Sequence, residues 1–346
     1  MKKIHNKNIQ QLIQLIKQHK TMCFGAGLQG RRVADFFENW KVSEQLQGFI
    51  DNSPSKAGQI VKCDNAKYRI YSLEEVEKTW RNEQILILVT CLNYKEIYEQ
   101  LDKIKNNWIY ISIDEVAEEQ FMLSDYPEVI KESDKILIPK KIHYAWLGKE
   151  MPYNLRKNIE YWKQLCPEYE FYEWNEKNYD VSQNQYMKQA YEKKMWGFVT
   201  DYMRLDVIYK YGGIYLDTDI EMIRKPDELL YQSCFGCIDA SLVMNLGSGF
   251  GAAPHAEIIR ELRDYYDDVM FIRDDGSIDN TSCNTHSYNV LKKYGVQVND
   301  MLQNVKGMNI YPMIFQGACH YTRKQRVTEK TYWVHYGNMS WFKKRG

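Results

Sequence analysis

Residues 198–221 read Phe-Val-Thr-Asp-Tyr-Met-Arg-Leu-Asp-Val-Ile-Tyr-Lys-Tyr-Gly-Gly-Ile-Tyr-Leu-Asp-Thr-Asp-Ile-Glu. In the first half of this stretch, apolar residues over 199–209 recur at helical spacing and form one broad stripe. Gly212 and Gly213 predict the end of that helix, since paired glycines adopt the positive φ angles that other residues resist. A short strand over residues 214–216 follows. The stretch therefore predicts a helix that turns back beside a strand.

Four charged side chains surround this predicted turn. Asp217 and Asp219 are two residues apart, and such residues point the same way in an extended chain. Asp201 and Arg204 are three apart on the predicted helix, so they share one helix face. An isolated Asp-x-Asp is usually a solvated turn, and the prediction therefore depends on the whole constellation. Three acids and one guanidinium together suit a divalent cation and a phosphorylated sugar.

The order of these motifs resembles a known family. Asp-x-x-Arg, a helix, Gly-Gly-x-Tyr and Asp-x-Asp in one run are similar to the sugar-binding region of Asp-x-Asp-containing glycosyltransferases, family 32. That family includes yeast initiating mannosyltransferases, bacterial capsule and lipopolysaccharide transferases and, distantly, the glucosylating clostridial toxins. The resemblance covers about residues 136–346 and implies a GT-A-type domain.

A second segment carries the same resemblance near the start of that domain. Residues 138–146 read Ile-Pro-Lys-Lys-Ile-His-Tyr-Ala-Trp, which is similar to the first nucleotide-binding strand of the family. The resemblance implies that Trp146 stacks on the base of the donor, an interaction worth roughly 1–3 kcal/mol. For His143 we expect instead a hydrogen-bonded histidine in the core.

A third segment lies at the end of the chain. Residues 332–341 read Tyr-Trp-Val-His-Tyr-Gly-Asn-Met-Ser-Trp. Family members close with a His followed by Ser-Trp, in a tail that covers the donor and supplies a metal ligand. By this resemblance His335 is the expected ligand, with Asn338 and Ser340 as alternatives, and Trp341 caps the site. The tail departs from the common His-His and Gly-Ser-Trp endings, which leaves the ligand atom open.

The resemblance implies a role for each of these residues. The expected metal ligands are Asp217, Asp219 and His335; the expected catalytic residues are Asp201, Arg204 and Asp217; the expected donor contacts are Trp146, Tyr215, Asp217 and Trp341. Asp217 would bridge the metal, Mn²⁺ or Mg²⁺, and the ribose, while Asp201 and Arg204 would hold sugar hydroxyls. Tyr215 faces either the sugar or the core. The family retains the α configuration of the donor sugar, and front-face departure with the leaving phosphate as base is our default hypothesis.

One loop in this domain leaves two interpretations open. Residues 241–250 read Ser-Leu-Val-Met-Asn-Leu-Gly-Ser-Gly-Phe, which predicts a strand followed by a flexible loop. Asn245 and Ser248 either hydrogen-bond a sugar or belong to a hinge that contacts no ligand.

The N-terminal part of the chain predicts a separate domain. Strands and helices alternate there, which favours a small doubly wound parallel sheet. Gly25, Gly27 and Gly30 form a Gly-x-Gly-x-x-Gly loop between a predicted strand and helix, and Asp51 ends the next strand, where a ribose-binding acid would lie. This pattern is similar to the nucleotide-sugar-binding domain of bacterial sugar O- and N-acyltransferases. Such a domain either binds a nucleotide or nucleotide-sugar or serves as an empty scaffold, and no dehydrogenase signature follows.

We therefore predict an α/β protein with a Rossmann-like domain before a GT-A-type glycosyltransferase domain. The expected boundaries are residues 1–125, a linker over 126–135, and residues 136–346. The charged stretch 114–134 shows little apolar periodicity and is the predicted connection between the domains.

Composition limits the partners and the compartment. Lys+Arg and Asp+Glu both number 46, so no net charge recruits nucleic acid. No segment reaches the ~18–20 apolar residues that span a bilayer, and the N-terminus has no signal-peptide core, which favours a cytoplasmic protein. Peripheral membrane attachment and the oligomeric state stay open. The eight cysteines are typical of reduced thiols, and Cys234-x-x-Cys237 has no second pair that would complete a zinc site.

The sequence thus favours a metal-dependent retaining glycosyltransferase. We expect a nucleotide-diphosphate sugar as donor, with UDP-hexose preferred, and an oligosaccharide or lipid-linked saccharide acceptor in surface polysaccharide synthesis. Two alternatives stay open, namely a binding protein that holds a nucleotide-sugar without transferring it and an oxidoreductase that uses the N-terminal domain.

Overall fold

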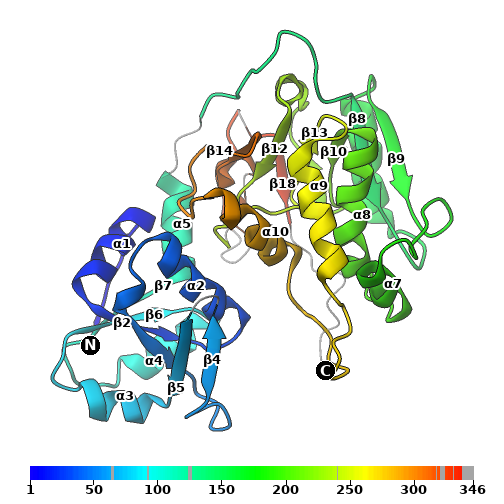
Figure 1. Cartoon of the computed structure of the whole chain (residues 1–346). Coiled ribbons are helices and arrows are strands. Elements are labelled where there is room, and N and C mark those ends of the chain that lie inside the picture. Colours follow the sequence, from blue (N-terminus) through cyan, green and yellow to red (C-terminus); the bar gives the residue numbers. More distant parts are fainter. Residues whose placement is uncertain are drawn as a thin grey trace. The chain divides into compact units, whose positions relative to one another are not determined.

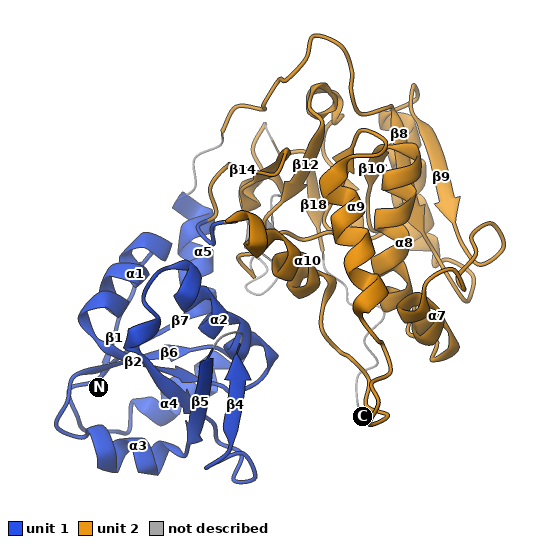
Figure 2. Ribbon diagram, in the orientation of Figure 1, with its two compact units in different colours: residues 1–123, 297–299 blue, residues 124–296, 300–346 orange. Residues whose placement is uncertain are grey.

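The computed structural model describes residues 1–63, 66–91, 93–123, 127–239, 241–316, 318–319, 324–329 and 331–336 (Figure 1). The chain forms two compact units, residues 1–123 with 297–299 and residues 124–296 with 300–346 (Figure 2). Each unit contains a mainly parallel or mixed sheet flanked by helices, so the predicted α/β class is confirmed.

Unit 1 is built on one seven-stranded sheet. Its elements are β1 (Lys2–Lys3), α1 (Ile9–Gln18), β2 (Lys20–Phe24), α2 (Leu28–Asn39), η1 (Ser43–Gln45), β3 (Leu46–Ile50), β4 (Ile60–Cys63), β5 (Ala66–Tyr71), α3 (Leu73–Trp80), β6 (Ile85–Val89), α4 (Tyr94–Leu101), β7 (Ile109–Ser112) and α5 (Ile113–Leu123). The strand order is β1-β7-β6-β2-β3-β5-β4, and every neighbouring pair is parallel except β4 with β5. The chain moves outward from β2 to β3 and β5 and then crosses back to β6 and β7, so a topological switch point lies between β2 and β6.

Successive side chains of the central strands point to opposite faces of this sheet, and both faces are buried. Met22, Phe24 and Ile87 belong to a core cluster that includes Val76 of α3 and Ile97 of α4. The intervening side chains of β2 and β6 are also buried and point to the opposite face. In Figure 1, α3 and α4 lie on one side of the sheet and α1 and α2 on the other. Because helices cover both faces of the sheet, its central strands are short and almost wholly apolar in sequence.

The predicted connection over residues 114–134 is wrong in its first half. Residues 113–123 form α5, which buries Ile113, Val116 and Phe121 despite its many acidic residues. Gln120 of this helix accepts a hydrogen bond from the backbone N–H of Ile9 at 3.4 Å, so α5 packs beside α1. The apolar stripe of α5 is not apparent in the sequence because its few apolar residues are interspersed with acidic ones. Residues 127–135 have no regular secondary structure.

Unit 2 has a second seven-stranded sheet. Its elements are β8 (Lys141–Ala145), α6 (Tyr153–Leu165), β9 (Glu170–Trp174), α7 (Gln185–Glu192), α8 (Trp196–Tyr211), β10 (Gly213–Tyr215), β11 (Ile220–Met222), η2 (Asp227–Tyr231), β12 (Cys234–Cys237), β13 (Phe250–Ala252), α9 (Glu257–Asp264), η3 (Tyr265–Asp268), α10 (Cys283–Leu291), η4 (Lys292–Tyr294), β14 (Gln303–Val305), β15 (Met308–Tyr311), η5 (Met313–Gln316), β16 (Ala318–Cys319), β17 (Lys324–Gln325) and β18 (Trp333–His335). The order is β14-β15-β12-β13-β10-β8-β9, and β9, β8 and β10 are parallel. Two small antiparallel pairs, β11 with β18 and β16 with β17, complete the unit.

Helix α8 is the central helix of this unit. The sequence predicted one apolar stripe along it, and this prediction is wrong, because every residue from Phe198 to Ile208 is buried. The helix packs against α7, α9 and β8, and α8 and α9 run side by side across the sheet (Figure 1). Gly212 ends it with φ 62° and Gly213 follows with φ 106°, so the predicted glycine turn is confirmed.

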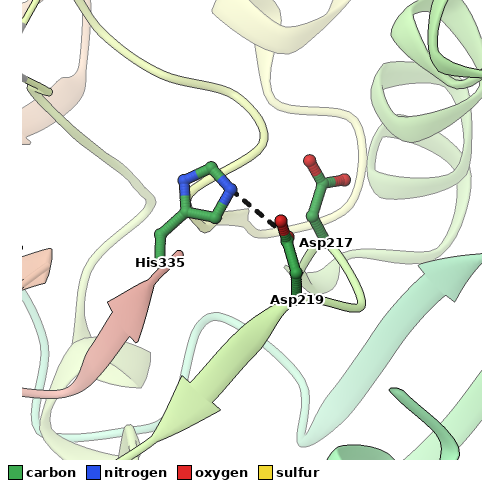
Figure 3. Close-up of side chains that lie close together, drawn as sticks. All are labelled: Asp217, Asp219 and His335. Carbon is green, nitrogen blue, oxygen red and sulfur yellow. Dashed lines mark ion pairs between the residues drawn. The ribbon is translucent and has the colours of Figure 1, made fainter. Parts of the chain in front are cut away.

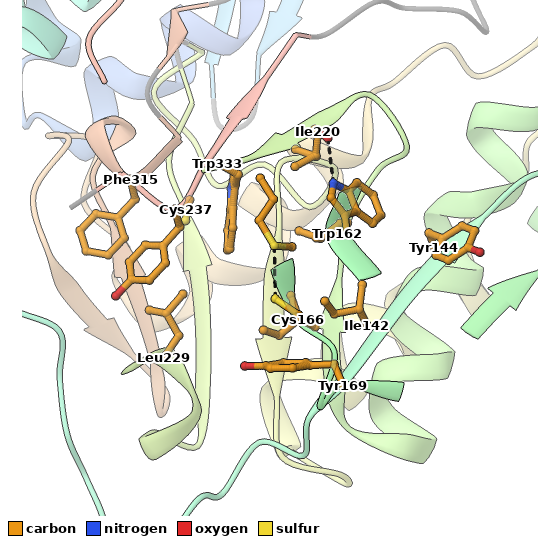
Figure 4. Packing of buried hydrophobic residues seen from close by; sticks show 14 of the residues in the cluster. Ile142, Tyr144, Trp162, Cys166, Tyr169, Ile220, Leu229, Cys237, Phe315 and Trp333 are labelled. Carbon is orange, nitrogen blue, oxygen red and sulfur yellow. Dashed lines mark hydrogen bonds between the residues drawn. The ribbon is translucent and has the colours of Figure 1, made fainter. Parts of the chain in front are cut away.

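The core of unit 2 lies where α6 meets the strands. Trp162 of α6 is fully buried and donates its indole N–H to the carbonyl of Ile220 at 3.1 Å (Figure 4). Trp333 of β18 belongs to the same cluster. Because Ile220 and Trp333 lie on β11 and β18, this packing holds the small two-stranded sheet against the main body of the unit.

One further prediction for unit 2 needs correction, and one segment was not assigned from the sequence. The strand expected early in residues 241–250 is replaced by turns with one isolated bridge at Met244, and β13 begins only at Phe250. The segment Cys234–Cys237, for which no element was predicted, is a buried strand, β12, and both of its cysteines are free. Within the described residues, no helix has the length and apolarity needed to cross a membrane.

Candidate active site

The site lies at one edge of the unit 2 sheet. Because β9, β8 and β10 are parallel, their carboxyl ends at Trp174, Ala145 and Tyr215 meet at the same edge. Trp146 directly follows β8, and Asp217 is the second residue after the end of β10. Ligands of open α/β sheets bind outside the carboxyl ends of parallel strands. The sheet therefore brings the two predicted donor-binding segments to one edge.

Three predicted metal ligands converge beside this edge. One ligand atom each from Asp217, Asp219 and His335 lies within 4.8 Å of the others (Figure 3). Nε2 of His335 is 3.3 Å from Oδ1 of Asp219. Two carboxylates and one imidazole fit a divalent cation, and the mixed set suits Mn²⁺ better than Mg²⁺, which prefers oxygen.

The pairing of β11 with β18 brings His335 to the two acids. In the antiparallel register, Ile220 lies opposite His335, so the histidine is one position from Asp219. Gly249, at φ 112°, allows the neighbouring loop to approach Trp333, since a Cβ there would lie 2.5 Å from the indole. The position of His335 thus depends on packing between segments far apart in the chain.

Asp217 and Asp219 were predicted to point the same way because they would lie in an extended chain, and this explanation is wrong. Strand β10 ends at Tyr215, and both acids lie in the turn between β10 and β11. This turn is closed by a hydrogen bond from the N–H of Ile220 to the carbonyl of Asp217 at 3.2 Å. A turn, and not strand alternation, therefore directs the two carboxylates to one place.

Arg204 connects the helix to this turn. Its Nη2 lies 3.4 Å from Oδ1 of Asp201, and its Nη1 lies 3.6 Å from Oδ1 of Asp217. Nε and Nη2 also donate to the backbone and hydroxyl oxygens of Thr200, at 3.0 and 2.8 Å. The guanidinium lies 5.1 Å from the ring of Tyr215, which is 1% exposed. Tyr215 is therefore buried against Arg204.

Burial shifts the pKa values of these groups. Burial raises the pKa of Asp201 to about 7, although the charge of Arg204 opposes this shift. Burial and the charge of Asp219 raise the pKa of Asp217, again against Arg204. Burial alone would lower the pKa of His335, but the hydrogen bond and negative charge of Asp219 outweigh it and raise the pKa. Several acids in one place with few cations are typical of a site that receives a cation.

The loop over residues 241–250, for which the sequence left two interpretations open, lies against the site. The backbone N–H of Asp217 donates to the carbonyl of Gly247 at 3.2 Å, and a Cβ on Gly247 would lie 2.3 Å from Oδ2 of Asp217. Asn245 accepts hydrogen bonds from the N–H groups of Gly247 and Ser248, at 2.8 and 3.2 Å. Asp239 accepts in turn from the side chain of Asn245 at 2.9 Å. The structure thus uses Asn245 and Ser248 to form the loop, and no sequence motif indicated Asp239.

Trp146 lies beside a cavity of about 600 Å³. This volume is typical of small-molecule sites. Its described lining includes Trp146, Asn175 and Arg156, whereas Asp217 and Asp219 are not part of it. The indole of Trp146 is partly exposed and donates its N–H to the carbonyl of Lys149 at 2.7 Å. The cavity and the carboxylates are therefore separate parts of the same strand edge.

His143 lies below this edge and is fully buried. Its Nε2 lies 2.9 Å from the carbonyl of Gly212, and its Nδ1 accepts from the indole N–H of Trp174 at 3.0 Å. Burial lowers the pKa of His143 to about 4. The prediction of a hydrogen-bonded core histidine is confirmed.

In unit 1, the three glycines occupy different environments. Gly25 has φ 118°, and Gly30 lies so close to it that a Cβ would be 1.8 Å from the Gly25 carbonyl oxygen. Gly27 precedes the first turn of α2, and a Cβ there would meet nothing within 4 Å. Gly25 and Gly30 are thus required by packing, whereas the space at Gly27 is open.

Asp51 closes this glycine loop. Its Oδ2 accepts from the backbone N–H of Ala26 at 3.1 Å and pairs with Lys56 at 2.8 Å, while Oδ1 accepts from the N–H of Ser53 at 2.9 Å. Burial would raise the pKa of Asp51, but these partners outweigh it and lower the pKa. The carboxylate expected to bind a ribose is therefore engaged within the chain.

Three predicted residues of the C-terminal tail, Asn338, Ser340 and Trp341, lie outside the described residues. The structure consequently provides no position for the predicted cap of the site.

Comparison with known proteins agrees with this site. Residues 152–236 match the family model described as "Glycosyltransferase sugar-binding region containing DXD motif". Inositol phosphoceramide mannosyltransferase 3 of Schizosaccharomyces pombe is 31% identical over 118 residues, which cover 31% of this chain and 31% of that protein. Subversion of eukaryotic traffic protein A of Legionella pneumophila is 26% identical over 110 residues, 24% of this chain and 17% of that protein.

The matched region includes the residues at the centre of the site. Asp201, Arg204, Asp217 and Asp219 all lie within residues 152–236, whereas Trp146 and His335 lie outside. The alignments span less than a third of either relative's own length. The family match supports a glycosyltransferase sugar-binding region in unit 2, since residues 152–236 lie within that unit.

Proposed function

We propose that this protein is a metal-dependent glycosyltransferase that moves a hexose from a nucleotide-diphosphate sugar to a saccharide acceptor with retention of configuration. The observation that carries the proposal is the convergence of Asp217, Asp219 and His335 within 4.8 Å at the carboxyl edge of parallel strands. The match of residues 152–236 to the DXD sugar-binding region supports the same function.

The metal would be held by Asp217, Asp219 and His335. A divalent cation, Mn²⁺ in preference to Mg²⁺, would neutralise the charge that develops on the departing diphosphate. Asp217 would also contact the ribose, and Trp146 beside its cavity would stack on the base. Asp201 and Arg204, fixed by their mutual ion pair and by Thr200, would orient the sugar hydroxyls.

Transfer exchanges one bond at the anomeric carbon. The bond from this carbon to the phosphate oxygen breaks, the acceptor hydroxyl oxygen bonds to the carbon, and its proton passes to the departing phosphate. A covalent intermediate would need a free carboxylate nearby. Among the described residues, Asp201 pairs with Arg204, and Asp239 is hydrogen-bonded to Ser241 and Asn245. These contacts favour front-face departure without such an intermediate.

The donor base and sugar need a direct screen. We keep a UDP-hexose as the preferred donor, and the similarity to a mannosyltransferase adds a GDP-mannosyl donor to the candidates. An oligosaccharide or lipid-linked saccharide on the cytoplasmic side would be the acceptor, with surface polysaccharide synthesis as the process. Trp341, in the C-terminal segment, would cover the bound donor.

A thermal-shift screen with UDP-, GDP- and CMP-sugars, each with and without Mn²⁺, tests the proposal. Stabilisation that requires both Mn²⁺ and one sugar nucleotide, together with release of the nucleoside diphosphate, is the expected result. Binding without release or transfer would favour a nucleotide-sugar-binding protein instead. Nicotinamide-dependent turnover would favour an oxidoreductase that uses the glycine loop of unit 1.

A further inference from the structure

Three aromatic side chains form a buried group in unit 2, behind the N-terminal half of α8. They are Tyr186 of α7, Tyr266 of η3 and His286 of α10. Their ring centroids are 4.9 Å apart for the two tyrosines, 5.3 Å for Tyr266 and His286, and 6.1 Å for Tyr186 and His286. The exposed fractions are 0%, 1% and 4%, respectively.

The polar atoms of this group have no hydrogen-bond partner among the described residues. These atoms are the hydroxyls of Tyr186 and Tyr266 and both ring nitrogens of His286. The nearest acid of His286 is Asp279, whose Oδ2 is 3.9 Å from Nε2 and too far for a hydrogen bond. Buried polar atoms without partners are destabilising, and native proteins keep few of them. Three such side chains in one contact group therefore need an explanation.

The group belongs to elements that pack around α8, the helix that carries the residues expected to hold the donor sugar, since α7 lies against α8. Tyr186 packs against Phe271 with ring centroids 5.4 Å apart, and Phe271 packs at 5.2 Å against Phe198, which lies one turn before Asp201 on α8. The charges of Asp201 and Arg204 also influence the pKa of Tyr186 and of Tyr266. Nη1 of Arg204 is also buried without a hydrogen-bond partner among the described residues, although it pairs with Asp217. Buried polar atoms without a hydrogen-bond partner among the described residues thus occur both in this group and on Arg204 of α8.

The chemistry of the group suits a neutral hydroxyl. Burial raises the pKa of both tyrosines and lowers the pKa of His286 to about 4, so all three side chains are uncharged near neutral pH. Phenol hydroxyls and a neutral imidazole each donate one hydrogen bond and accept another, as sugar hydroxyls also do. Among the described residues, Arg204 is the cation that influences this group, and it is already paired with Asp201 and Asp217, so an anionic group would compete with these acids for it.

We propose that Tyr186, Tyr266 and His286 form the floor of the donor-sugar pocket and bind its hydroxyls, directly or through one water. This floor would select a neutral hexose over a uronic acid. The inference deepens the proposed function and depends on it, since it assigns the side chains that determine which sugar is accepted.

The test compares the full-length chain with Tyr186→Phe and Tyr266→Phe. The readout is kcat/KM for Mn²⁺-dependent hydrolysis of the neutral hexose donor that the wild type uses best, of its monodeoxy analogues and of the matching uronic acid donor. We expect each variant to lose about tenfold with the parent donor, the effect of one lost hydrogen bond. With one monodeoxy analogue, the variant and the wild type should be equal. The uronic acid donor should be a poor substrate for the wild type.

Stability separates this role from a structural one. Removing an unpartnered buried hydroxyl should leave the Tm of both variants unchanged or raised, and binding of the free nucleoside diphosphate should stay the same. Tyr169→Phe is the matched control, because the Tyr169 hydroxyl donates to Asp227 at 2.7 Å and neither residue belongs to the site. That variant should lower the Tm and leave kcat/KM unchanged.

Two results would overturn the inference. Wild-type turnover that both tyrosine variants retain in full, or lose equally with every deoxy analogue while the Tm falls, would show a structural role and leave the proposed function standing. A wild-type chain that neither binds nor hydrolyses any sugar nucleotide would overturn the proposed function, and this inference with it.

Discussion

Oδ1 of Asp219 lies 3.3 Å from Nε2 of His335, although the two residues come from distant parts of unit 2. The antiparallel pair β11–β18 creates this relationship by setting Ile220 opposite His335. Asp217 joins them within 4.8 Å. The group therefore depends on the pairing of two short strands that are far apart in the chain.

Asp219→Asn and His335→Ala should each weaken Mn²⁺ binding more than roughly 10–100-fold. A loss of that size is typical when a residue that only supports a metal ligand is removed. Each substitution removes one ligand atom from a set of three. Isothermal titration with Mn²⁺ measures the effect. Glu221→Gln is a matched control on β11, because the Glu221 side chain is exposed and not part of the cluster. Equal affinity in all variants would show that the metal binds elsewhere or not at all.

Gly247→Ala should disturb the site although it replaces no metal ligand and changes no charge. The new Cβ would lie 2.3 Å from Oδ2 of Asp217 and 3.1 Å from Nη1 of Arg204, so both side chains must move. We expect Mn²⁺ affinity to fall about 10–100-fold, as for a disturbed supporting residue. Titration of the purified variant checks this, and wild-type affinity would mean that the 245–249 loop does not define the site.

Two substitutions in unit 1 should differ sharply in their effect on stability. Gly30→Ala would place a Cβ 1.8 Å from a backbone oxygen, and we expect a loss of about 3 kcal/mol or more in the free energy of unfolding. Gly27→Ala meets nothing within 4 Å, so its cost should stay within about 1 kcal/mol. Urea denaturation measures both. If Gly27→Ala alone abolished binding of a nucleotide, unit 1 would be a ligand-binding domain and not an empty scaffold.

Acid should destabilise the chain through His143. Its pKa is about 4 in the folded state against an ordinary value of about 6.5. The unfolded chain therefore binds the proton more tightly, and the stabilisation is present above about pH 6.5 and lost as the pH falls toward 4. Between pH 7 and 5 the contribution is about 2 kcal/mol, from roughly 1.4 kcal/mol per pKa unit.

The comparison of wild type with His143→Gln tests this contribution. Unfolding free energies at pH 7, 6 and 5 should decline less steeply in the variant by about 2 kcal/mol over this range. His286, whose pKa is also about 4, acts in the same direction in both proteins and therefore cancels in the comparison. Parallel pH profiles would contradict the assignment.

Local signals predicted much of the fold. The glycine pair after α8, the strand and helix on either side of the Gly25–Gly30 loop and the strand that ends before Asp51 all follow from turn chemistry and periodicity, and the structure has them. Strand β12 and helix α5 were missed for physical reasons. A buried strand that contains Gly236 and two cysteines shows no alternation, and acidic residues conceal the stripe of α5.

The site could be predicted only in part. Asp201, Arg204, Asp217 and Asp219 lie in one continuous stretch, whereas His335 was assigned through a resemblance and reaches the acids through strand pairing. The group of Tyr186, Tyr266 and His286 comes from three separate elements. Aromatic residues of this kind are typical of cores, so only the three-dimensional contacts and the missing hydrogen-bond partners single them out.

The most direct test of the central claim is release of nucleoside diphosphate from a sugar nucleotide in the presence of Mn²⁺, measured for the wild type, Asp217→Asn and Glu221→Gln. We predict Mn²⁺-dependent release by the wild type and by Glu221→Gln, and none above background by Asp217→Asn with its fold intact by circular dichroism. Full release by Asp217→Asn, or release by the wild type that persists without any divalent cation, would contradict the account.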